Sequence, residues 1–169
     1  MPNNPEDEYV ALIQQHEGII HKVIKLYVDD EEDKKDLRQE ILLQAWKSFP
    51  RFKGHSSFGT WLYRVALNTV FSYTRTAKKR PESSMEIPEK PAEPAEPVEQ
   101  HELLFRLIRQ FDEVDRSLMT LHLDGYQNKE IAGILGLTVN HVNVKIHRLK
   151  AQIIKAFKNQ QDGYSENVA

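Results

Sequence analysis

The segment from Thr138 to Lys150 carries side chains that can bind the edges of DNA bases. If Val142, Ile146 and Leu149 face a core, a rotation of about 100° per residue turns the positions between them outward. Asparagine can hydrogen-bond adenine at two points, arginine can do the same with guanine, and a small apolar side chain can meet a thymine methyl. The residues predicted to contact duplex DNA are Thr138, Asn140, His141, Asn143, Val144, Lys145, His147 and Arg148. The alternative is a solvated helix face in a protein-interaction bundle, which accounts less well for an outward Val144.

A second polar face lies on a helix predicted from about Ser57 to Lys79. Its outward positions recur at helical spacing and are Arg64, Asn68, Phe71 and Arg75. The preceding loop, residues 49–58, places Arg51, Lys53 and His55 among three phenylalanines. A basic stripe with interleaved aromatic rings suits a nucleic-acid backbone and unstacked bases. The sequence leaves open the alternative that the phenylalanines are core residues and the charges are only solvated.

A third constellation is acidic and lies on the helix predicted from about Asp33 to Phe49. Its members share one face at helical spacing and are Asp36, Gln39, Glu40 and Leu43. An acidic face beside a basic stripe is a poor match for DNA. It suits either a protein partner with basic side chains or ordinary helix surface, and the sequence does not separate the two.

Enzyme chemistry finds no support in the sequence. The run HEGIIH places His16 and His21 five residues apart, about 140° around a helix, whereas two ligands of one metal need a spacing of four. The chain has no cysteine, so disulfides and metal–thiolate sites are excluded. There is no glycine-rich phosphate loop and no serine nucleophile elbow. We therefore expect a protein without catalytic activity, metal or cofactor.

The elements that position these residues fall into two modules. The net charge of −2 divides into blocks of −5 over residues 1–35, +7 over 36–80, −7 over 81–126, +5 over 127–159 and −2 over 160–169. Residues 81–99 hold five of the eight prolines and six glutamates, a composition typical of a disordered linker. This pattern predicts an N-terminal domain (1–80), a flexible acidic linker (81–99), a C-terminal domain (100–160) and a disordered tail (161–169). Two basic regions on one chain indicate contact with a polyanion at two places.

Apolar periodicity predicts that both modules are helical and that the fold is all-α. The N-terminal module is expected to contain a first helix from Pro5 to Tyr27, capped by Asn4 and with Val10 on its inward face, and the two helices named above. The C-terminal module is expected to contain helices over residues 103–111, 114–123 and 128–135, and a fourth that begins after Thr138. Gly136 between the last two predicts a helix-turn-helix. The polar N-terminal segment and the absence of a long apolar run predict a soluble, cytoplasmic protein without membrane insertion.

Two stretches of the sequence resemble a known family. The run DLRQEILLQAWKSFPRFKGHSSFGTWLYRVALNTVFSYTR resembles region 2 of the extracytoplasmic-function (ECF) sigma factors of bacterial RNA polymerase. The run GYQNKEIAGILGLTVNHVNVKIHRLK resembles region 4 of the same family. The order of the modules, the F-x-G-x-S-x-F-x-T-W-L segment and the terminal helix-turn-helix make the match specific.

The resemblance implies a function and a set of roles. The protein would be an alternative sigma factor that directs core RNA polymerase to specific promoters. Residues implied in reading and melting the minus-ten element, as single-stranded DNA, are Phe52, Lys53, Gly54, His55, Ser56, Trp61, Arg64, Asn68 and Arg75. The helix after Thr138 would read the minus-thirty-five element as duplex. The face with Asp36, Gln39, Glu40 and Leu43 would dock on a coiled coil of the polymerase's largest subunit, and the polymerase flap is a further implied contact. An anti-sigma factor is a partner common in the family, and no residue identifies one.

Two other functions fit parts of the pattern. A stand-alone helix-turn-helix regulator would need a dimer to span two half-sites, and the sequence shows no heptad seam for one. An interaction-only adaptor would use both basic faces to bind acidic proteins. Alanine at Asn68 or Arg148 would alter promoter selection if these residues read DNA, and would leave transcription unchanged in an adaptor.

Overall fold

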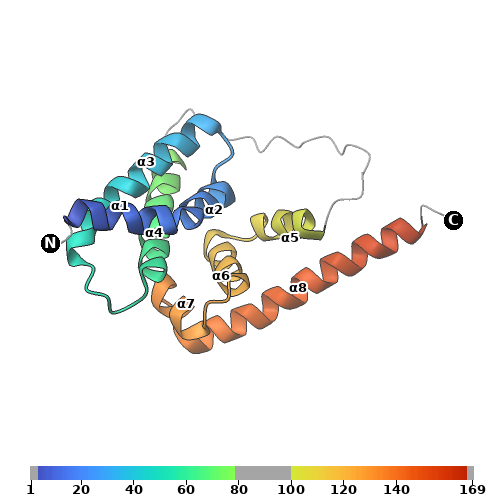
Figure 1. The fold of residues 1–169 in the computed structure, drawn as a ribbon. Helices are drawn as coiled ribbons and strands as arrows, with labels where there is room; N and C mark the ends of the chain where they lie inside the picture. The colour runs from blue at the N-terminus through green and yellow to red at the C-terminus, as the bar shows by residue number, and fades with distance from the viewer. Residues whose placement is uncertain (1–3, 79–99, 167–169) are drawn as a thin grey trace. The chain divides into compact units, whose positions relative to one another are not determined.

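The computed structural model describes residues 4–78 and 100–166 of the chain (Figure 1). It divides into two compact units, Met1–Glu89 and Lys90–Ala169. Both are helical, as the sequence predicts, and no strand occurs in either described range. The predicted linker, residues 81–99, lies outside the described residues, and so do the last three residues of the predicted tail.

Residues 4–78, the described part of the N-terminal unit, form four α-helices and one short 3-10 turn. They are α1 (Pro5–Gln15), α2 (Glu17–Tyr27), α3 (Glu31–Ser48), the turn η1 (Phe49–Arg51) and α4 (Phe58–Lys78). α4 packs against α2 and α3 (Figure 1). The core is built where the apolar stripes of these helices meet, from fully buried residues such as Val23, Leu37, Ile41, Leu62 and Val70. Each such side chain contributes about 1.5–3 kcal/mol by leaving water, so this core fixes the directions of α3 and α4.

The predicted single helix from Pro5 to Tyr27 is wrong, because the structure has two helices that meet at His16. His16 has φ −117° and ψ 13°, outside the helical region. Its Nδ1 donates to the carbonyl oxygen of Leu12 at 2.9 Å, and its ring packs against Phe58 at 5.1 Å. α1 therefore buries Tyr9 and Ile13 and leaves Val10, predicted to face the core, exposed.

Side-chain caps set where several helices begin. The Asp30 carboxylate accepts from the backbone N–H groups of Glu32 and Asp33, so α3 starts two residues before its predicted beginning. Asn4 caps α1, as predicted. The Ser57 hydroxyl accepts from the N–H of Thr60 at 3.1 Å at the start of α4. Each cap satisfies a backbone donor that the first helical turn leaves unpaired.

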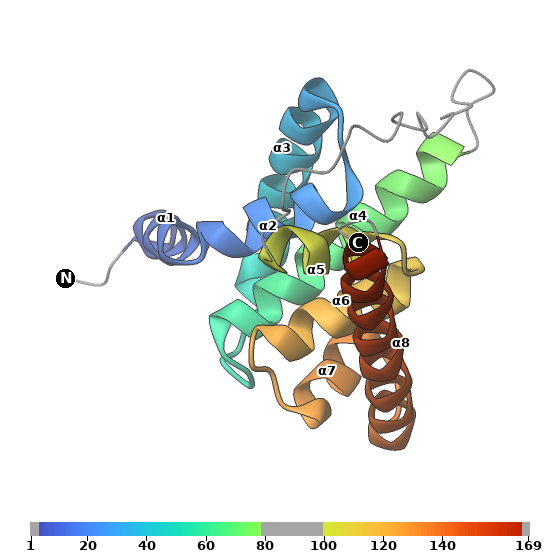
Figure 2. The same ribbon diagram turned by 90° about the vertical axis from the view of Figure 1, so that its right-hand side faces the viewer.

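The C-terminal unit contains α5 (Gln100–Arg109), α6 (Glu113–Leu123), α7 (Asn128–Leu135) and α8 (Val139–Glu166). α6, α7 and the N-terminal part of α8 pack on one another (Figure 2). Gly136 ends α7 with φ 68°, a left-handed conformation that glycine adopts without strain. This arrangement confirms the predicted helix-turn-helix.

α8 is longer than the sequence pattern predicts. It continues to Glu166, so residues 161–166, predicted as part of a disordered tail, are helical. No proline interrupts this stretch and a single glycine, Gly163, costs only about 1 kcal/mol, so the backbone hydrogen bonds of the helix continue past the last inward-facing residue. Among the helices described, none is long and apolar enough to cross a membrane.

Candidate nucleic-acid interface

α8 presents a polar face above an apolar stripe. Val142, Ile146 and Leu149 are buried against the rest of the C-terminal unit, as predicted. The side chains on the opposite side are exposed, and they are Asn140, His141, Asn143, Val144, His147 and Arg148. Val144 is 59% exposed, so its methyl groups lie on the same open face as these polar side chains.

The turn before α8 holds its first residues in place. The Thr138 hydroxyl accepts from the backbone N–H of His141 at 3.1 Å, which confirms the predicted cap. This hydrogen bond fixes the N-terminal end of α8. That end is the part of a recognition helix that meets base edges.

Asn143 is oriented by a side chain of α7. Asn128 donates from Nδ2 to Oδ1 of Asn143 at 2.5 Å. One lone pair of this amide oxygen is therefore used inside the protein, and the Asn143 side chain remains exposed. The sequence pattern does not show this pairing, since the two residues lie 15 positions apart.

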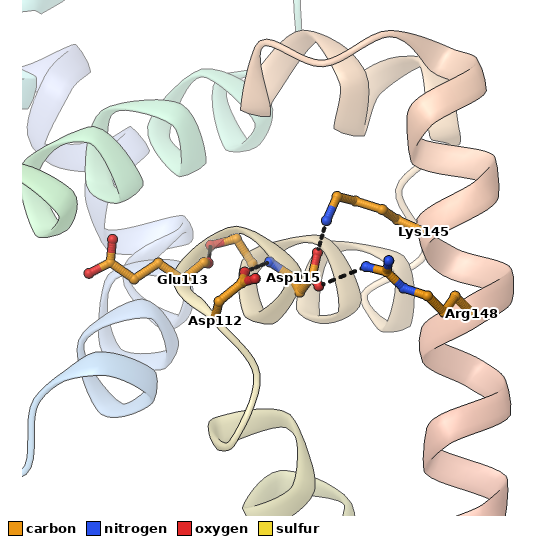
Figure 3. Close-up of polar contacts among 6 residues, drawn as sticks. Asp112, Glu113, Asp115, Lys145 and Arg148 are labelled. Carbon is orange, nitrogen blue, oxygen red and sulfur yellow. Dashed lines mark hydrogen bonds and ion pairs between the residues drawn. The ribbon is translucent and has the colours of Figure 1, made fainter.

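Two cations of α8 converge on one carboxylate of α6 (Figure 3). Lys145 Nζ lies 2.5 Å from Oδ1 of Asp115, and a terminal nitrogen of Arg148 lies 3.4 Å from Oδ2. The Asp115 side chain is only 9% exposed and that of Lys145 only 16%, whereas Arg148 remains 55% exposed. Lys145, predicted to contact DNA, thus lies against the protein. Sequence reasoning missed Asp115, although a carboxylate on the inward face of an amphipathic helix is a signal that it needs a cationic partner.

The polar face of α4 is exposed as the sequence predicts. Arg64, Asn68 and Arg75 point outward, and Phe71 is half-buried with its ring 5.8 Å from that of Tyr27. Neither arginine has an ion-pair partner in the described parts of the chain. Phe71 is therefore a packing residue, and the two arginines and the amide are the groups that this face offers to a ligand.

The loop between η1 and α4 rests on a cluster of aromatic rings. The Phe52 ring lies 5.7 Å from Phe58 and 5.2 Å from Trp61, and Phe49 contacts all three. Phe58 is buried, while Phe52 and Trp61 are half-buried. The four rings therefore pack on one another, and of the three phenylalanines Phe58 is the one that is buried as a core residue. The loop exposes Lys53, Gly54, His55 and Ser56, with Gly54 at φ 70°.

The acidic face of α3 adjoins the polar face of α4. A groove of about 610 Å³ between these helices is lined by Asp36 and Glu40 on one side and by Asn68, Ser72 and Thr76 on the other. Glu40 accepts from Nε2 of Gln44 at 2.7 Å. Residues predicted to bind two different partners thus lie in one groove.

The outer part of the α3 face is more apolar than its sequence pattern indicates. Leu43 is 44% exposed, and Trp46, one turn later, is 39% exposed. The Trp46 ring packs edge-on against Tyr9 at 5.0 Å, so it is held in place although it meets solvent. Sequence reasoning missed Trp46. Its spacing of three from Leu43 places it on the same side of the helix and would have indicated it.

Three side chains in the two units have shifted pKa values. Burial raises the pKa of the Tyr9 phenol. Burial is also the main cause of the raised pKa of Tyr126, and the negative charges of Asp124 and Glu130 add to it. The pKa of His122 is lowered mainly by burial and also by the positive charge of Lys150. No group of acidic and histidine side chains in the described residues has the arrangement of a metal site.

Comparison with known proteins identifies the two units. Residues 12–80 match the family model of sigma-70 region 2, and residues 101–153 match that of sigma-70 region 4. The chain is 30% identical over 161 residues to the ECF RNA polymerase sigma-E factor of Escherichia coli strain K12, covering 84% of this chain and 82% of that protein. The chain belongs to the ECF family of RNA polymerase sigma factors.

This sigma factor has further relatives of similar length. It is 28% identical over 160 residues to the RNA polymerase sigma-H factor of Pseudomonas aeruginosa PAO1, with 82% of this chain and 81% of that protein covered. As an alternative sigma factor it acts with core RNA polymerase and promoter DNA in transcription initiation. Membership in the family decides against the stand-alone regulator and the interaction-only adaptor.

Two solved structures share the fold of this sigma factor. The structure of CnrH in complex with the cytosolic domain of CnrY has a TM-score of 0.66 at 19% identity, covering 93% of this chain and 91% of that chain. The sigma factor RpoE in complex with the anti-sigma factor NepR from Bartonella quintana also has a TM-score of 0.66, at 14% identity, covering 90% and 96%. At these identities the likeness establishes the fold alone.

Proposed function

We propose that the two units divide promoter recognition between them. The exposed face of α4 and the loop before it bind the minus-ten element as a single strand. The polar face of α8 binds the minus-thirty-five element as duplex, and the outer face of α3 docks on the coiled coil of the largest polymerase subunit. The observation that carries this division is that each unit buries its apolar stripe and exposes a separate cationic, amide-bearing surface.

The assignment of the minus-ten site rests on α4 and its loop. Arg64 and Arg75 supply charge for phosphates, and Asn68 between them supplies both a donor and an acceptor for a base edge. Unstacked bases suit this surface better than duplex, because the acidic wall of the α3–α4 groove lies beside Asn68 and would repel a second strand. The contacting residues are Lys53, Gly54, His55, Ser56, Arg64, Asn68 and Arg75, with Phe52 and Trp61 supporting the loop from below.

The assignment of the minus-thirty-five site rests on α8. Its outward residues offer amide, imidazole, guanidinium and methyl groups along one face, the combination that the major groove reads. Thr138 fixes the helix start, and the contacting residues are Asn140, His141, Asn143, Val144, His147 and Arg148.

The polymerase-docking face combines charge with apolar area. Asp36, Gln39 and Glu40 are followed by the exposed side chains of Leu43 and Trp46. A tryptophan held rigidly at the surface is a typical energetic centre of a protein interface, and acidic neighbours select a basic partner. The polymerase flap is a further proposed contact. We infer that the protein works in the cytoplasm, where core polymerase is, and that it has no catalytic activity of its own.

Transcription in vitro tests the proposal. Core polymerase from the source organism is incubated with pooled genomic DNA, with and without this protein, and the 5′ ends of the RNA are sequenced. Discrete new start sites that share two upstream elements are the expected result. Variants Asn68→Ala and Val144→Asp are then compared with the wild type on the promoters found.

The variants separate the two units. With Asn68→Ala, the loss of transcription should differ most between promoters that differ in the minus-ten element. With Val144→Asp, it should differ most between promoters that differ in the minus-thirty-five element, because the added carboxylate faces the DNA phosphates. Binding to core polymerase, measured by size-exclusion chromatography, should be unchanged in both. Loss of core binding in either variant, or no change in promoter use in both, would contradict the proposed division.

A further inference from the structure

The carboxylate of Asp115 is held inside the protein at the back of the proposed recognition helix. It lies in the first turn of α6 and is almost fully buried. The N–H of Asp115 donates to Oδ1 of Asp112 at 2.8 Å, which fixes the start of the helix from which the side chain projects. Figure 3 shows Lys145 and Arg148 reaching this carboxylate from α8. One negative charge thus faces two positive charges that the sequence pattern assigns to DNA.

Lys145 is closer to Asp115 and more buried than Arg148 is. Lys145 makes a contact of 2.5 Å and its side chain is 16% exposed, so its ammonium group is largely withdrawn from solvent. Arg148 lies farther away, at 3.4 Å, and its side chain is 55% exposed. The guanidinium group has five N–H donors, so it can keep this contact and still bind a second acceptor.

Withdrawal of Lys145 from Asp115 would be unfavourable. Removing one partner from a buried ion pair leaves an uncompensated charge in a poorly solvated place. A phosphate at the protein surface offers the ammonium group a partner in water, where the attraction between two charges is weak. Lys145 should therefore keep its bond to Asp115 when DNA binds.

We propose that Asp115 is a positioning residue for promoter recognition: it keeps Lys145 off the DNA and holds Arg148 at the edge of the DNA-facing surface. α8 then engages DNA with one cation fewer than its sequence offers. Phosphate contacts are independent of sequence, so withholding one lowers non-specific binding more than it lowers base reading. This inference rests on the proposed contact between α8 and duplex DNA.

The salt dependence of DNA binding tests the proposal directly. The full-length chain is titrated against a fluorescent duplex of about 30 base pairs at several NaCl concentrations, and log K is plotted against log salt. Each phosphate contact contributes about −0.9 to this slope. Arg148→Met should make the slope shallower by up to that amount, and Lys145→Met should leave it unchanged.

The possible outcomes distinguish a failure of the proposed role of Asp115 from a failure of the proposed DNA binding by α8. A shallower slope in both variants would show that Lys145 meets a phosphate, which overturns the role of Asp115 and leaves DNA binding by α8 intact. An unchanged slope in both would remove α8 from the DNA interface and overturn the proposed function of this surface together with the role of Asp115.

A second pair of variants acts on the carboxylate itself. Asp115→Asn should release Lys145 and make the slope steeper by about 0.9, with a smaller ratio of promoter to non-specific affinity. Glu113→Gln removes the same charge from the same turn of α6, and Figure 3 shows Glu113 pointing away from α8. It should keep the wild-type slope. A helical Asp115→Asn protein with the wild-type slope overturns the proposal, and if that variant does not fold, the result for Lys145→Met decides.

Discussion

The surfaces proposed to face DNA in the two units hold their cations differently. On α4, Arg64 and Arg75 have no ion-pair partner in the described residues, and the surface is shaped from below by apolar and aromatic packing. On α8, Lys145 and Arg148 share a buried carboxylate. In the proposed division, the α4 surface would offer its full charge to the backbone of a single strand, whereas the α8 surface would offer less charge and depend more on base contacts.

Removing the centre of the aromatic cluster should have the largest effect. Phe58 is buried and contacts His16, Phe49, Phe52 and Trp61, so Phe58→Ala should cost about 3–5 kcal/mol of stability in the N-terminal unit. The chain has two tryptophans, Trp46 and Trp61, and both lie in this unit, so urea unfolding followed by tryptophan fluorescence reports on it alone.

A loop residue without ring contacts provides the control for this change. His55→Ala, at an exposed position, should change the stability by no more than about 0.5 kcal/mol. If Phe58→Ala costs less than about 1 kcal/mol, then aromatic packing does not shape the α4 surface and the contrast with α8 loses its basis.

Loss of the amide on α4 should have the next largest effect. A side chain that reads a base contributes about 1–3 kcal/mol, so Asn68→Ala should slow promoter melting by about 5- to 150-fold. Permanganate reactivity of unpaired thymines in the holoenzyme–promoter complex measures the melted strand. Gln14→Ala removes an exposed amide from α1 and should melt DNA at the wild-type rate. Equal melting by both variants would place the minus-ten contact elsewhere.

A smaller effect is expected from the amide that orients Asn143. Asn128→Ala removes the hydrogen bond to Oδ1 of Asn143, worth about 0.5–1.5 kcal/mol, and frees the amide to rotate. Base preference at one position of the minus-thirty-five element should then relax by about 2- to 13-fold. Selection from a randomised promoter library by the holoenzyme measures it, with the exposed Gln152→Ala on α8 as control. Unaltered preference would mean that Asn143 reads no base.

The smallest effect concerns pH and is confined to the C-terminal unit. Burial, and then the charge of Lys150, lower the pKa of His122 in the folded protein. The unfolded chain, with a histidine pKa near 6.5, therefore takes up the proton first as the pH falls. The stabilisation is present above this value and is lost as the pH drops through the folded pKa.

Replacing the imidazole tests this dependence. Urea unfolding followed by circular dichroism at about pH 7.5 and pH 5.5 should show a loss of stability in the wild type that His122→Gln reduces. Tryptophan fluorescence of the same samples provides the N-terminal unit as an internal control. An identical loss in both proteins would show that His122 does not couple folding to pH.

Much of the fold was predictable because helices are local structures. The inward stripes of α3, α7 and α8 follow from apolar spacing, and the ends of α7 and α8 follow from Gly136 and Thr138. The break at His16 was not predictable in this way. No proline marks it, and it is held in part by a ring contact with Phe58, which lies 42 positions later in the sequence.

The candidate site likewise has features that follow from local sequence and features that depend on tertiary contacts. Helical periodicity decides which residues of α4 and α8 face outward. The sequence alone was therefore enough to predict the outward positions of Arg64, Asn68 and Val144. Which of the outward cations remain available to a ligand was decided only by the tertiary structure. The partner of Lys145 stands 30 positions earlier on another helix, and an ion pair depends on the distance between two atoms in space, which helical periodicity does not encode.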